Sequence, residues 1–253
     1  IFTLKKIGIK KKDTIFVNPE IYKFGFYEDA TNNHEYFYVF YQTLKNLIGP
    51  SGTLCMNTYS FDTLRYNKKF NYNDSRTTSG KLSEILLKDK NSVRSHHPVF
   101  SVSAIGKYAD YICKNNSFHN YGYCSPYHKF LNKNGKIINL GMNPWQNSFH
   151  HVSEFLIGVP YYYNKFTNVK YFKNKKKYNE KYTSFVRYLN FDLIENFDEI
   201  ERLLKKKKLI TSFKLGDSYA HSLDANKYVN LCIKILSKNQ FAFINKKEYI
   251  NSL

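Results

Sequence analysis

The sequence predicts an α/β fold built around a parallel strand–helix–strand unit near its N-terminus. Residues 13–17 (DTIFV) form a short apolar run, residues 34–48 carry apolar and aromatic side chains at helical spacing, and residues 53–57 (TLCMN) form a second apolar run. Residues 49–52 (GPSG) separate the helix from the second strand, because glycine and proline end helices. The short connections between these segments favour a parallel pair of strands with a right-handed crossover.

The later elements continue this alternation of strands and helices. Residues 136–140 form a buried strand that leaves through Gly141, and a polar loop then leads into a helix. Ser125 and Pro126 break the chain ahead of residues 129–131. Helices are also expected at residues 80–87, 107–114 and 192–204 and after Asp224, and strands within residues 94–106 and at residues 183–189, 209–215 and 241–244.

A single domain is expected over residues 1–253, because no linker divides the chain. Two excursions over the surface interrupt it. Residues 64–79 show no clear period, and an aromatic, basic segment near residues 161–180 is expected to form strand or loop over the core. A chain of this length can bury a substantial core.

The composition is that of a globular protein expected in the cytoplasm. Hydrophobic residues make up 42% of the chain, and no apolar run reaches the length of about 20 residues that spans a bilayer. No signal peptide is recognisable, although the chain begins at Ile1. The cysteines, at positions 55, 113, 124 and 232, form no CxxC pair, which indicates reduced thiols and not a disulfide framework or a zinc site.

The net charge of +19, from 39 Lys and Arg against 20 Asp and Glu, has two interpretations. Together with 18% aromatic residues, it is compatible with a non-catalytic nucleic-acid-binding protein. The lysines are scattered, however, and accompany many Asn, Tyr, Phe and Ile residues, as an A+T-rich coding bias would produce. This favours an ordinary solvated surface. In either case the positive electrostatic field of the protein attracts anionic small molecules and disfavours strongly cationic ones.

The most informative candidate site lies where a strand end leads into a helix. His151 and Glu154 are three residues apart at the start of that helix, which places both side chains on one face. A carboxylate beside an imidazole fixes its tautomer and raises its basicity, so the pair would serve as a general base. The same pattern also fits a solvated or capping pair. A metal site is less favoured, because the HExxH order and a second set of ligands are absent.

A second candidate site combines Arg94, Ser95, His97 and Ser101 beside a predicted strand. The guanidinium and hydroxyl groups would bind a phosphate, and Pro98 would hold the imidazole of His97 in place. A structural turn, in which Arg94 pairs with a carboxylate, is an equally good interpretation.

Known nucleotide-binding and nucleophile motifs are absent. The sequence has no GxGxxG, GxxxxGK[ST] or GxSxG segment, and no cysteine lies in a recognisable nucleophile motif. Covalent catalysis therefore has no positive support. A base at His151, an anion site around Arg94 and the hydroxyl of Thr58 at a strand end fit direct transfer between two bound substrates.

The order of several segments resembles the aminoglycoside 3-N-acetyltransferase family, the antibiotic acetyltransferases that do not have the GNAT fold. The similarity runs from about residue 7 to residue 160, and the C-terminal part matches only loosely. The matching segments are GIKKKDT at residues 8–14, GPSGTL at 49–54, NTY at 57–59, GKLSE at 80–84, RSHHP at 94–98, GYCSP at 122–126 and NSFHHVSE at 147–154.

This resemblance implies a three-layer α/β/α sandwich with a central mixed sheet, and an acetyl-CoA-dependent N-acetyltransferase. It assigns His151 as the catalytic base with Glu154 alongside it, and it places Thr58 near the reacting thioester. The site of acetyl-CoA (coenzyme A) would be lined by the early strand-end loops and by four residues of the second candidate site, Arg94, Ser95, His97 and Ser101. No metal, nucleic acid or membrane span is expected, and the oligomeric state is not indicated.

Two departures from the family pattern affect the expected substrates. The family usually has His-Ser-Ser after the first strand, where this chain has Asn18, Pro19 and Glu20, and the loss of these donors is expected to weaken coenzyme binding. Ser148 replaces the usual threonine, which is a mild change. Because aminoglycosides are polycations and the chain carries +19, we expect an amino-sugar acceptor of lower positive charge, nucleotide-linked and destined for a surface polysaccharide. The alternative is an aminoglycoside 3-N-acetyltransferase that confers antibiotic resistance.

Overall fold

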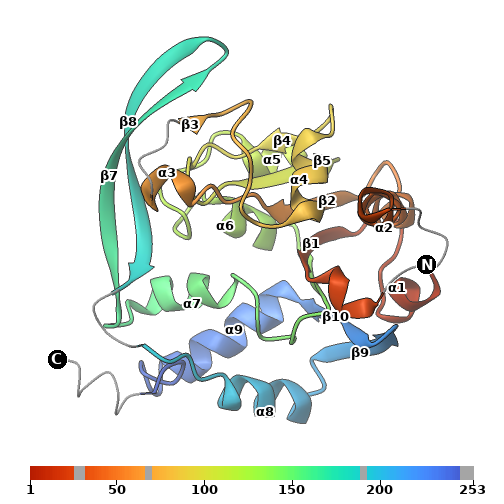
Figure 1. Cartoon of the computed structure of the whole chain (residues 1–253). Coiled ribbons are helices and arrows are strands. Elements are labelled where there is room, and N and C mark those ends of the chain that lie inside the picture. The colour runs from red at the N-terminus through yellow and green to blue at the C-terminus, as the bar shows by residue number, and fades with distance from the viewer. Residues whose placement is uncertain (26–31, 66–69, 189–192, 246–253) are drawn as a thin grey trace.

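The computed structural model describes residues 1–25, 32–65, 70–188 and 193–245, and Figure 1 shows its elements. The strands are β1 (Thr14–Pro19), β2 (Thr53–Asn57), β3 (Phe70–Asn71), β4 (Val93–Arg94), β5 (Val102–Gly106), β6 (Lys136–Leu140), β7 (Tyr162–Lys173), β8 (Lys176–Arg187), β9 (Ile210–Leu215) and β10 (Ser218–Asp224). The helices are α1 (Phe2–Lys6), the short 3-10 helix η1 (Ile21–Phe24), α2 (Asn33–Ile48), α3 (Asp62–Arg65), α4 (Lys81–Lys88), α5 (Ala109–Cys113), α6 (Pro126–Leu131), α7 (His150–Ile157), α8 (Asp198–Lys206) and α9 (Ala225–Leu236).

The centre of the molecule is a seven-stranded sheet in the order β4-β5-β2-β1-β6-β10-β9. β1 is parallel to both of its neighbours, with Thr14 opposite Thr53 of β2 and Phe16 opposite Ile137 of β6. The other pairs in this sheet are antiparallel. The sheet is therefore mixed, and the predicted parallel unit of β1, α2 and β2 is confirmed.

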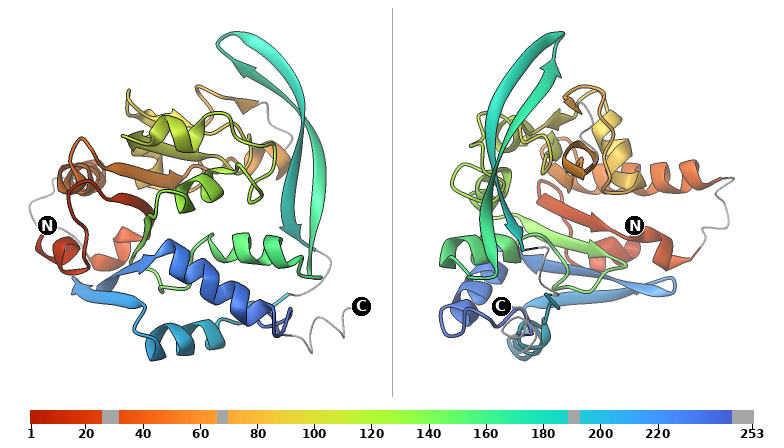
Figure 2. Two further views of the ribbon diagram at one scale, coloured as in Figure 1. Left: turned by 180° about the vertical axis from the view of Figure 1, so that it is seen from behind. Right: turned by 60° about the vertical axis from the view of Figure 1, so that its left-hand side comes forward.

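Alternating side chains of β1 contribute to a core on each face of this sheet. Ile15 and Val17 lie in one core, together with Leu44 of α2 and Leu86 of α4. Successive side chains of a strand point to opposite faces. Phe16 accordingly lies in the second core, to which α5, α6, α7 and α9 contribute. Helices cover both faces of the sheet (Figures 1 and 2), which confirms the predicted α/β/α arrangement.

The excursion expected near residues 161–180 is a long antiparallel hairpin formed by β7 and β8. Figure 2 shows this hairpin, in teal, standing out from the body of the molecule. β3 pairs with β7, and the hydroxyl groups of Tyr171 and Tyr182 contact the imidazole of His96 at 2.6 and 2.9 Å. The other end of the hairpin, where Tyr162 pairs with Arg187, lies next to α7. The expectation of a single domain over residues 1–253 stays a prediction.

The helix predicted over residues 192–204 is shorter in the structure. α8 begins at Asp198, and residues 193–197 are not helical. Asp198 and Glu199 lie in the first turn of α8, where carboxylates favour helix initiation through the helix dipole. The predicted start signal, Asp192, lies outside the described residues.

Two other local predictions differ from the structure, and one strand was not predicted. Pro126 does not break the chain but begins α6, because the side chain of Ser125 accepts a hydrogen bond from the backbone N–H of His128 and caps the helix. Residues 241–244 form a turn and not a strand, with an isolated bridge between Glu195 and Ile244. The interior strand β10 was not predicted, since its sequence, SYAHSLD, has few apolar residues.

The remaining features concern the cysteines and the membrane. The four cysteines are free. Within the described residues, no helix has both the length and the apolar composition that crossing a bilayer requires. The cytoplasmic location stays a prediction.

Candidate active site

The loop between β6 and α7 brings the predicted base to the edge of the parallel strands. Gly141 follows β6 with φ of +73°, and a Cβ atom there would lie 2.4 Å from the backbone oxygen of Glu20, so the exit requires glycine. Before α7, the side chain of Asn147 accepts a hydrogen bond from the backbone N–H of Phe149 at 3.0 Å. This side chain–backbone turn fixes the direction in which α7 begins.

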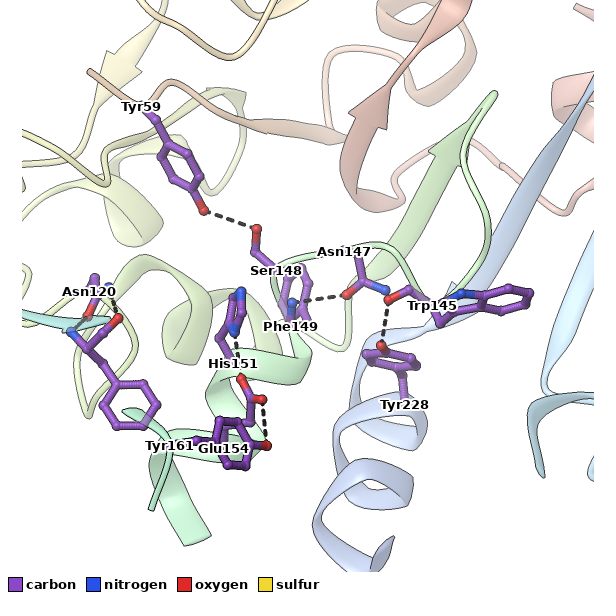
Figure 3. Close-up of polar contacts among 11 residues, drawn as sticks. Tyr59, Asn120, Trp145, Asn147, Ser148, Phe149, His151, Glu154, Tyr161 and Tyr228 are labelled. Atoms are coloured by element: carbon purple, nitrogen blue, oxygen red, sulfur yellow. Dashed lines mark hydrogen bonds and ion pairs between the residues drawn. The ribbon is translucent and has the colours of Figure 1, made fainter. Parts of the chain in front are cut away.

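His151 and Glu154 form a hydrogen-bonded pair on the first turns of α7 (Figure 3). The Nδ1 atom of His151 lies 2.6 Å from Oε2 of Glu154, and the hydroxyl group of Tyr161 donates to Oε1 of the same carboxylate at 2.9 Å. Glu154 is buried, whereas 19% of the His151 side chain is exposed. The structure thus brings together the two residues that the sequence pairs, and it adds Tyr161.

Burial governs the protonation of this pair. It lowers the pKa of His151 to about 4 and raises the pKa of Glu154 to about 7. The imidazole is therefore neutral at neutral pH. Above pH 7, where Glu154 is ionised, its carboxylate accepts at Nδ1, so we assign the proton to Nδ1, which leaves the lone pair of Nε2 free to accept a proton. This is the state that a general base requires.

Two cavities meet at His151. One, of about 440 Å³, lies between α7 and the hairpin, and the other, of about 470 Å³, lies at the carboxyl ends of β1 and β2. We call them the hairpin cavity and the strand-end cavity. Their linings share His151, Phe61 and Glu195. Two substrates placed one in each cavity would both reach the same imidazole.

A network of hydroxyl groups forms part of the wall of the strand-end cavity. The hydroxyl of Ser148 lies 3.0 Å from that of Tyr59 and accepts a hydrogen bond from the side-chain amide of Asn57 at 3.1 Å. Tyr127 bonds to both Tyr59 and Asn57 from the core side. Tyr59 and Ser148 point toward each other near His151 in Figure 3. The sequence did not identify Tyr59 as a site residue, although it follows directly after the strand end at residues 57–58.

Thr58 does not line either cavity. Its side chain is fully buried, and its hydroxyl lies 3.2 Å from that of Ser101 and 2.9 Å from that of Ser103. The backbone N–H of Thr58 donates to the carbonyl of Ser101. In this geometry Thr58 supports the turn that presents Tyr59, and it is not itself placed against a reacting thioester.

Arg94 also faces the interior instead of a cavity, so the anion site expected there is not formed in this structure. Its guanidinium group donates to the carbonyls of Ser75 and Thr58 at 2.8 and 3.0 Å, and to the hydroxyls of Ser60 and Ser101 at 2.7 and 2.9 Å. Arg94 is only 4% exposed. With four hydrogen bonds to the protein, Arg94 ties three segments together, but its partners are carbonyl and hydroxyl groups and not the carboxylate that the structural interpretation expected.

The two other members of the second candidate site are likewise occupied by protein partners. The hydroxyl of Ser95 accepts from the backbone N–H of Val102 at 2.8 Å. Nδ1 of His97 accepts from the backbone N–H groups of Val99 and Phe100, and burial lowers the pKa of this imidazole to about 3. The turn reaches the hairpin cavity only through Val99 and Phe100.

One cluster of side chains could hold a metal ion. Within the described ranges, the only group of three His, Cys, Asp or Glu residues whose ligand atoms lie close enough, within 4.8 Å of one another, consists of His150, His151 and Glu154. Nδ1 of His150 is buried without a hydrogen-bond partner. The carboxylate of Glu154, however, already accepts from both His151 and Tyr161, so the geometry fits an orienting carboxylate better than a metal ligand. That no metal is needed stays a prediction.

Comparison with known proteins identifies the family. The sequence model described as aminoglycoside 3-N-acetyltransferase matches residues 35–237. A search of curated proteins found no match. The family match confirms the predicted enzyme class, a coenzyme A-dependent N-acyltransferase that uses acetyl-CoA as co-substrate.

Solved structures of similar fold agree with this assignment. A variant of AAC(3)-IVa in complex with a gentamicin has a TM-score of 0.78 and 21% identity, over 96% of this chain and 88% of that one. AAC-IIIb in a binary complex with CoASH has a TM-score of 0.77 and 18% identity, over 94% of each chain. The YokD protein from Bacillus subtilis has a TM-score of 0.76 and 19% identity, over 94% of this chain and 97% of that one. The chain belongs to the aminoglycoside 3-N-acetyltransferase family.

Proposed function

We propose that the protein transfers the acetyl group of acetyl-CoA directly to an amino group of an aminoglycoside or a related amino sugar, with His151 as the general base. The observation that carries this proposal is the position of His151, which lines both cavities while its Nδ1 atom is held by Glu154. The thioester would lie in the strand-end cavity and the acceptor in the hairpin cavity.

The chemistry follows from the groups around the imidazole. Nε2 of His151 takes a proton from the acceptor nitrogen as this nitrogen attacks the thioester carbonyl. Glu154 stabilises the imidazolium that forms, and the hydroxyl of Tyr59 or Ser148 donates to the developing oxyanion. Collapse of the tetrahedral intermediate breaks the carbon–sulfur bond, and the thiolate of coenzyme A leaves. Thr58 and Arg94 act indirectly, because they hold the turn that carries Tyr59.

The coenzyme end of the strand-end cavity differs from the family pattern. Asn18, Pro19 and Glu20 line it, and the side-chain amide of Asn18 is bonded to Asn139 at 2.9 Å. Pro19 has no N–H to donate. Weak binding of coenzyme A stays a prediction, and titration calorimetry with coenzyme A measures it.

An aminoglycoside is the first candidate for the acceptor. The family carries this activity in its name, and the similar structures of AAC(3)-IVa and AAC-VIa contain a gentamicin and sisomicin, respectively. The second candidate is another amino sugar of lower positive charge, for example a nucleotide-linked precursor of a surface polysaccharide. Two exposed cations in the hairpin cavity, Lys165 and Arg187, favour the second candidate.

A thiol-release assay with acetyl-CoA and a panel of aminoglycosides and nucleotide-linked amino sugars tests the proposal. His151→Ala should lower kcat by about 100-fold or more, since a positioned base contributes about 10²–10⁴-fold. His34→Ala, an exposed histidine of α2, is the matched control and should leave kcat unchanged. An unchanged kcat in His151→Ala would remove this residue from the mechanism. No thiol release with any amine, combined with salt-dependent binding to DNA or RNA, would instead support the nucleic-acid-binding alternative.

A further inference from the structure

A third cavity, of about 630 Å³, lies between α8 and the strands β9 and β10. We call it the α8 cavity. Its volume falls within the range of about 300–1,000 Å³ that is typical of small-molecule sites. In the described part of the chain it shares no lining residue with the hairpin cavity or the strand-end cavity. The polar and aromatic side chains that line it include Trp145, Lys205, Lys208, Ser212, Tyr219 and His221.

The strand residues of the α8 cavity share one face of the sheet. Tyr219 and His221 are two residues apart on β10, and Ser212 of β9 lies directly opposite His221 in the antiparallel register. The rings of Tyr219 and His221 are nearly parallel, with an interplanar angle of 18°. On the facing wall, Glu201 and Lys205 are four residues apart and lie on one face of α8. The register and the helix spacing therefore direct these side chains into one space.

Trp145 contributes an indole ring to this cavity from a fixed backbone. Its carbonyl accepts hydrogen bonds from the backbone N–H of Asn147 at 3.0 Å and from the hydroxyl of Tyr228 at 3.1 Å (Figure 3). The side chain packs against the core to which α7 and α9 contribute. Aromatic rings such as those of Trp145 and Tyr219 are stacking surfaces for a nucleobase, because every base has a π face.

Lys208 and His221 supply the polar groups that a nucleotide needs. Lys208 forms no ion pair with a carboxylate of the described residues, whereas Lys205 pairs with Glu201. An unpaired lysine is available to bind a phosphate as a point charge. Burial lowers the pKa of His221 below its ordinary value, so its imidazole is neutral at neutral pH. Its Nδ1 atom lies 2.7 Å from the hydroxyl of Ser212, and Nε2, which has no hydrogen bond within the described ranges, is left for the polar edge of a base.

The α8 cavity and the strand-end cavity lie along the same two segments of the chain. Trp145 lines the first cavity, and the next residues, Gln146 and Asn147, line the second. Likewise Phe197, just before α8, lines the strand-end cavity, and Glu201 of α8 lines the α8 cavity. Among the described residues that line the strand-end cavity, none is Lys or Arg, so it offers no cationic side chain to the phosphate groups of a coenzyme. A coenzyme that extends past the loop of Trp145 brings its nucleotide end to the α8 cavity.

We propose that the α8 cavity is a nucleotide-binding site, in which a base lies against the rings of Trp145 and Tyr219 and a phosphate group binds Lys208. The nucleotide end of acetyl-CoA and a free nucleotide offer this same chemistry. The site itself does not depend on the proposed function, and only its assignment to the coenzyme rests on that function.

The fluorescence of Trp145 tests the site directly, because the chain has no other tryptophan. Adenosine 3′,5′-bisphosphate, which is coenzyme A without its thiol-bearing arm, should change this fluorescence saturably in the wild type. Lys208→Gln should raise the Kd about tenfold, through the loss of a charge-assisted hydrogen bond. Lys206→Gln is the matched control, since Lys206 is an exposed lysine of α8 that does not line the cavity, and it should leave the Kd unchanged. Equal Kd values for the wild type and Lys208→Gln, or no saturable change with the nucleotide, would overturn the proposal.

A comparison of acetyl-CoA with S-acetylpantetheine, which lacks the nucleotide, separates the two sources. If the cavity holds the coenzyme, Lys208→Gln should raise the KM for acetyl-CoA about tenfold and leave the KM for S-acetylpantetheine unchanged. If it holds a free nucleotide, both KM values should stay unchanged while the fluorescence titration still separates the variant from the wild type. An equal rise in both KM values would overturn the nucleotide site, since Lys208 would then act on the arm that the two thioesters share. The titration requires no acetyl transfer, so it gives its answer even if the proposed function fails.

Discussion

Replacing Glu154 by Gln isolates the contribution of its negative charge. Gln has nearly the same shape and keeps an oxygen that accepts a hydrogen bond from Nδ1 of His151. In the wild type the buried carboxylate accepts from His151 at 2.6 Å and from Tyr161 at 2.9 Å. Glu154→Gln therefore changes the charge beside the imidazole while it preserves the packing, and the hydroxyl group of Tyr161, which donates to the carboxylate in the wild type, accepts from the side-chain amide instead.

The expected loss follows from the strength of the hydrogen bond that changes. A hydrogen bond to a charged group contributes about 1.5–3 kcal/mol, and one between neutral groups about 0.5–1.5 kcal/mol. When His151 takes the proton from the acceptor, the imidazolium faces a carboxylate in the wild type and a neutral amide in the variant. The barrier should rise by about 1–2 kcal/mol, so kcat should fall about 5- to 30-fold.

The free energy of unfolding should not fall in the same variant. Burial raises the pKa of Glu154 to about 7, so the folded protein binds this proton more tightly than the unfolded chain does. The cost of holding the buried charge is thus absent at pH values below the ordinary carboxyl pKa and fully present above pH 7. Gln removes this cost, and the resulting gain in the free energy of unfolding should be largest at alkaline pH.

Steady-state thiol release and thermal unfolding at pH 8 measure both effects. The matched control is Glu84→Gln on α4, a carboxylate that pairs with Lys81 and Lys88 away from His151, and it should leave kcat unchanged. A wild-type kcat in Glu154→Gln would refute an electrostatic role for Glu154. A melting temperature lowered by more than about 5 °C would show that the lost activity reflects unfolding, because such a shift corresponds to more than about 1 kcal/mol.

Three further predictions concern the surrounding residues. Arg94→Ala should lower the free energy of unfolding, measured in urea, by about 3–5 kcal/mol, because buried carbonyls and hydroxyls lose their donor. A raised KM for acetyl-CoA with unchanged stability would contradict this structural role of Arg94. Tyr59→Phe and Ser148→Ala should each lower kcat, by up to about 100- to 1000-fold for the hydroxyl that donates to the oxyanion, and should change KM less. An equal loss in kcat and in affinity for acetyl-CoA would argue for a binding role. Burial lowers the pKa of His97 to about 3, so His97 takes up a proton on unfolding between about pH 6.5 and pH 3. The contribution of this group to the free energy of unfolding should therefore fall by about 1.4 kcal/mol for each pH unit of acidification in that range. Urea titrations between pH 7 and pH 5 should show a shallower decline for His97→Gln, and parallel slopes would contradict the assignment.

The elements that the sequence predicted correctly depend on local patterns. The unit of β1, α2 and β2 follows from apolar periodicity and from the breaker cluster at residues 49–52, which act over a few residues. The pairing of His151 with Glu154 is equally local, because a spacing of three residues on a helix brings the side chains together whatever the rest of the chain does.

The features that were not predicted depend on contacts between distant segments. The sequence shows the donors of Arg94 but not the carbonyls of Ser75 and Thr58 that occupy them, so an anion site and a structural turn looked alike. The hairpin cavity is assembled from residues near positions 61, 121, 151, 165, 187 and 195, and no sequence pattern connects these positions. β10 shows the same limit, since its place between β6 and β9 makes it an interior strand although its composition is polar.

The two cavities that meet at His151 predict direct transfer within a ternary complex. An acyl-enzyme would need a nucleophile beside the imidazole, and the described contacts of Ser148 are with Tyr59 and Asn57, not with His151. Three of the cysteine thiols are buried, and Cys124 lines neither cavity. Initial-rate lines for varied acetyl-CoA at several acceptor concentrations should therefore intersect, and labelled coenzyme A should not exchange into acetyl-CoA without acceptor. Parallel lines together with such exchange would establish a covalent intermediate, because only a stored acetyl group lets coenzyme A leave and return before the acceptor binds.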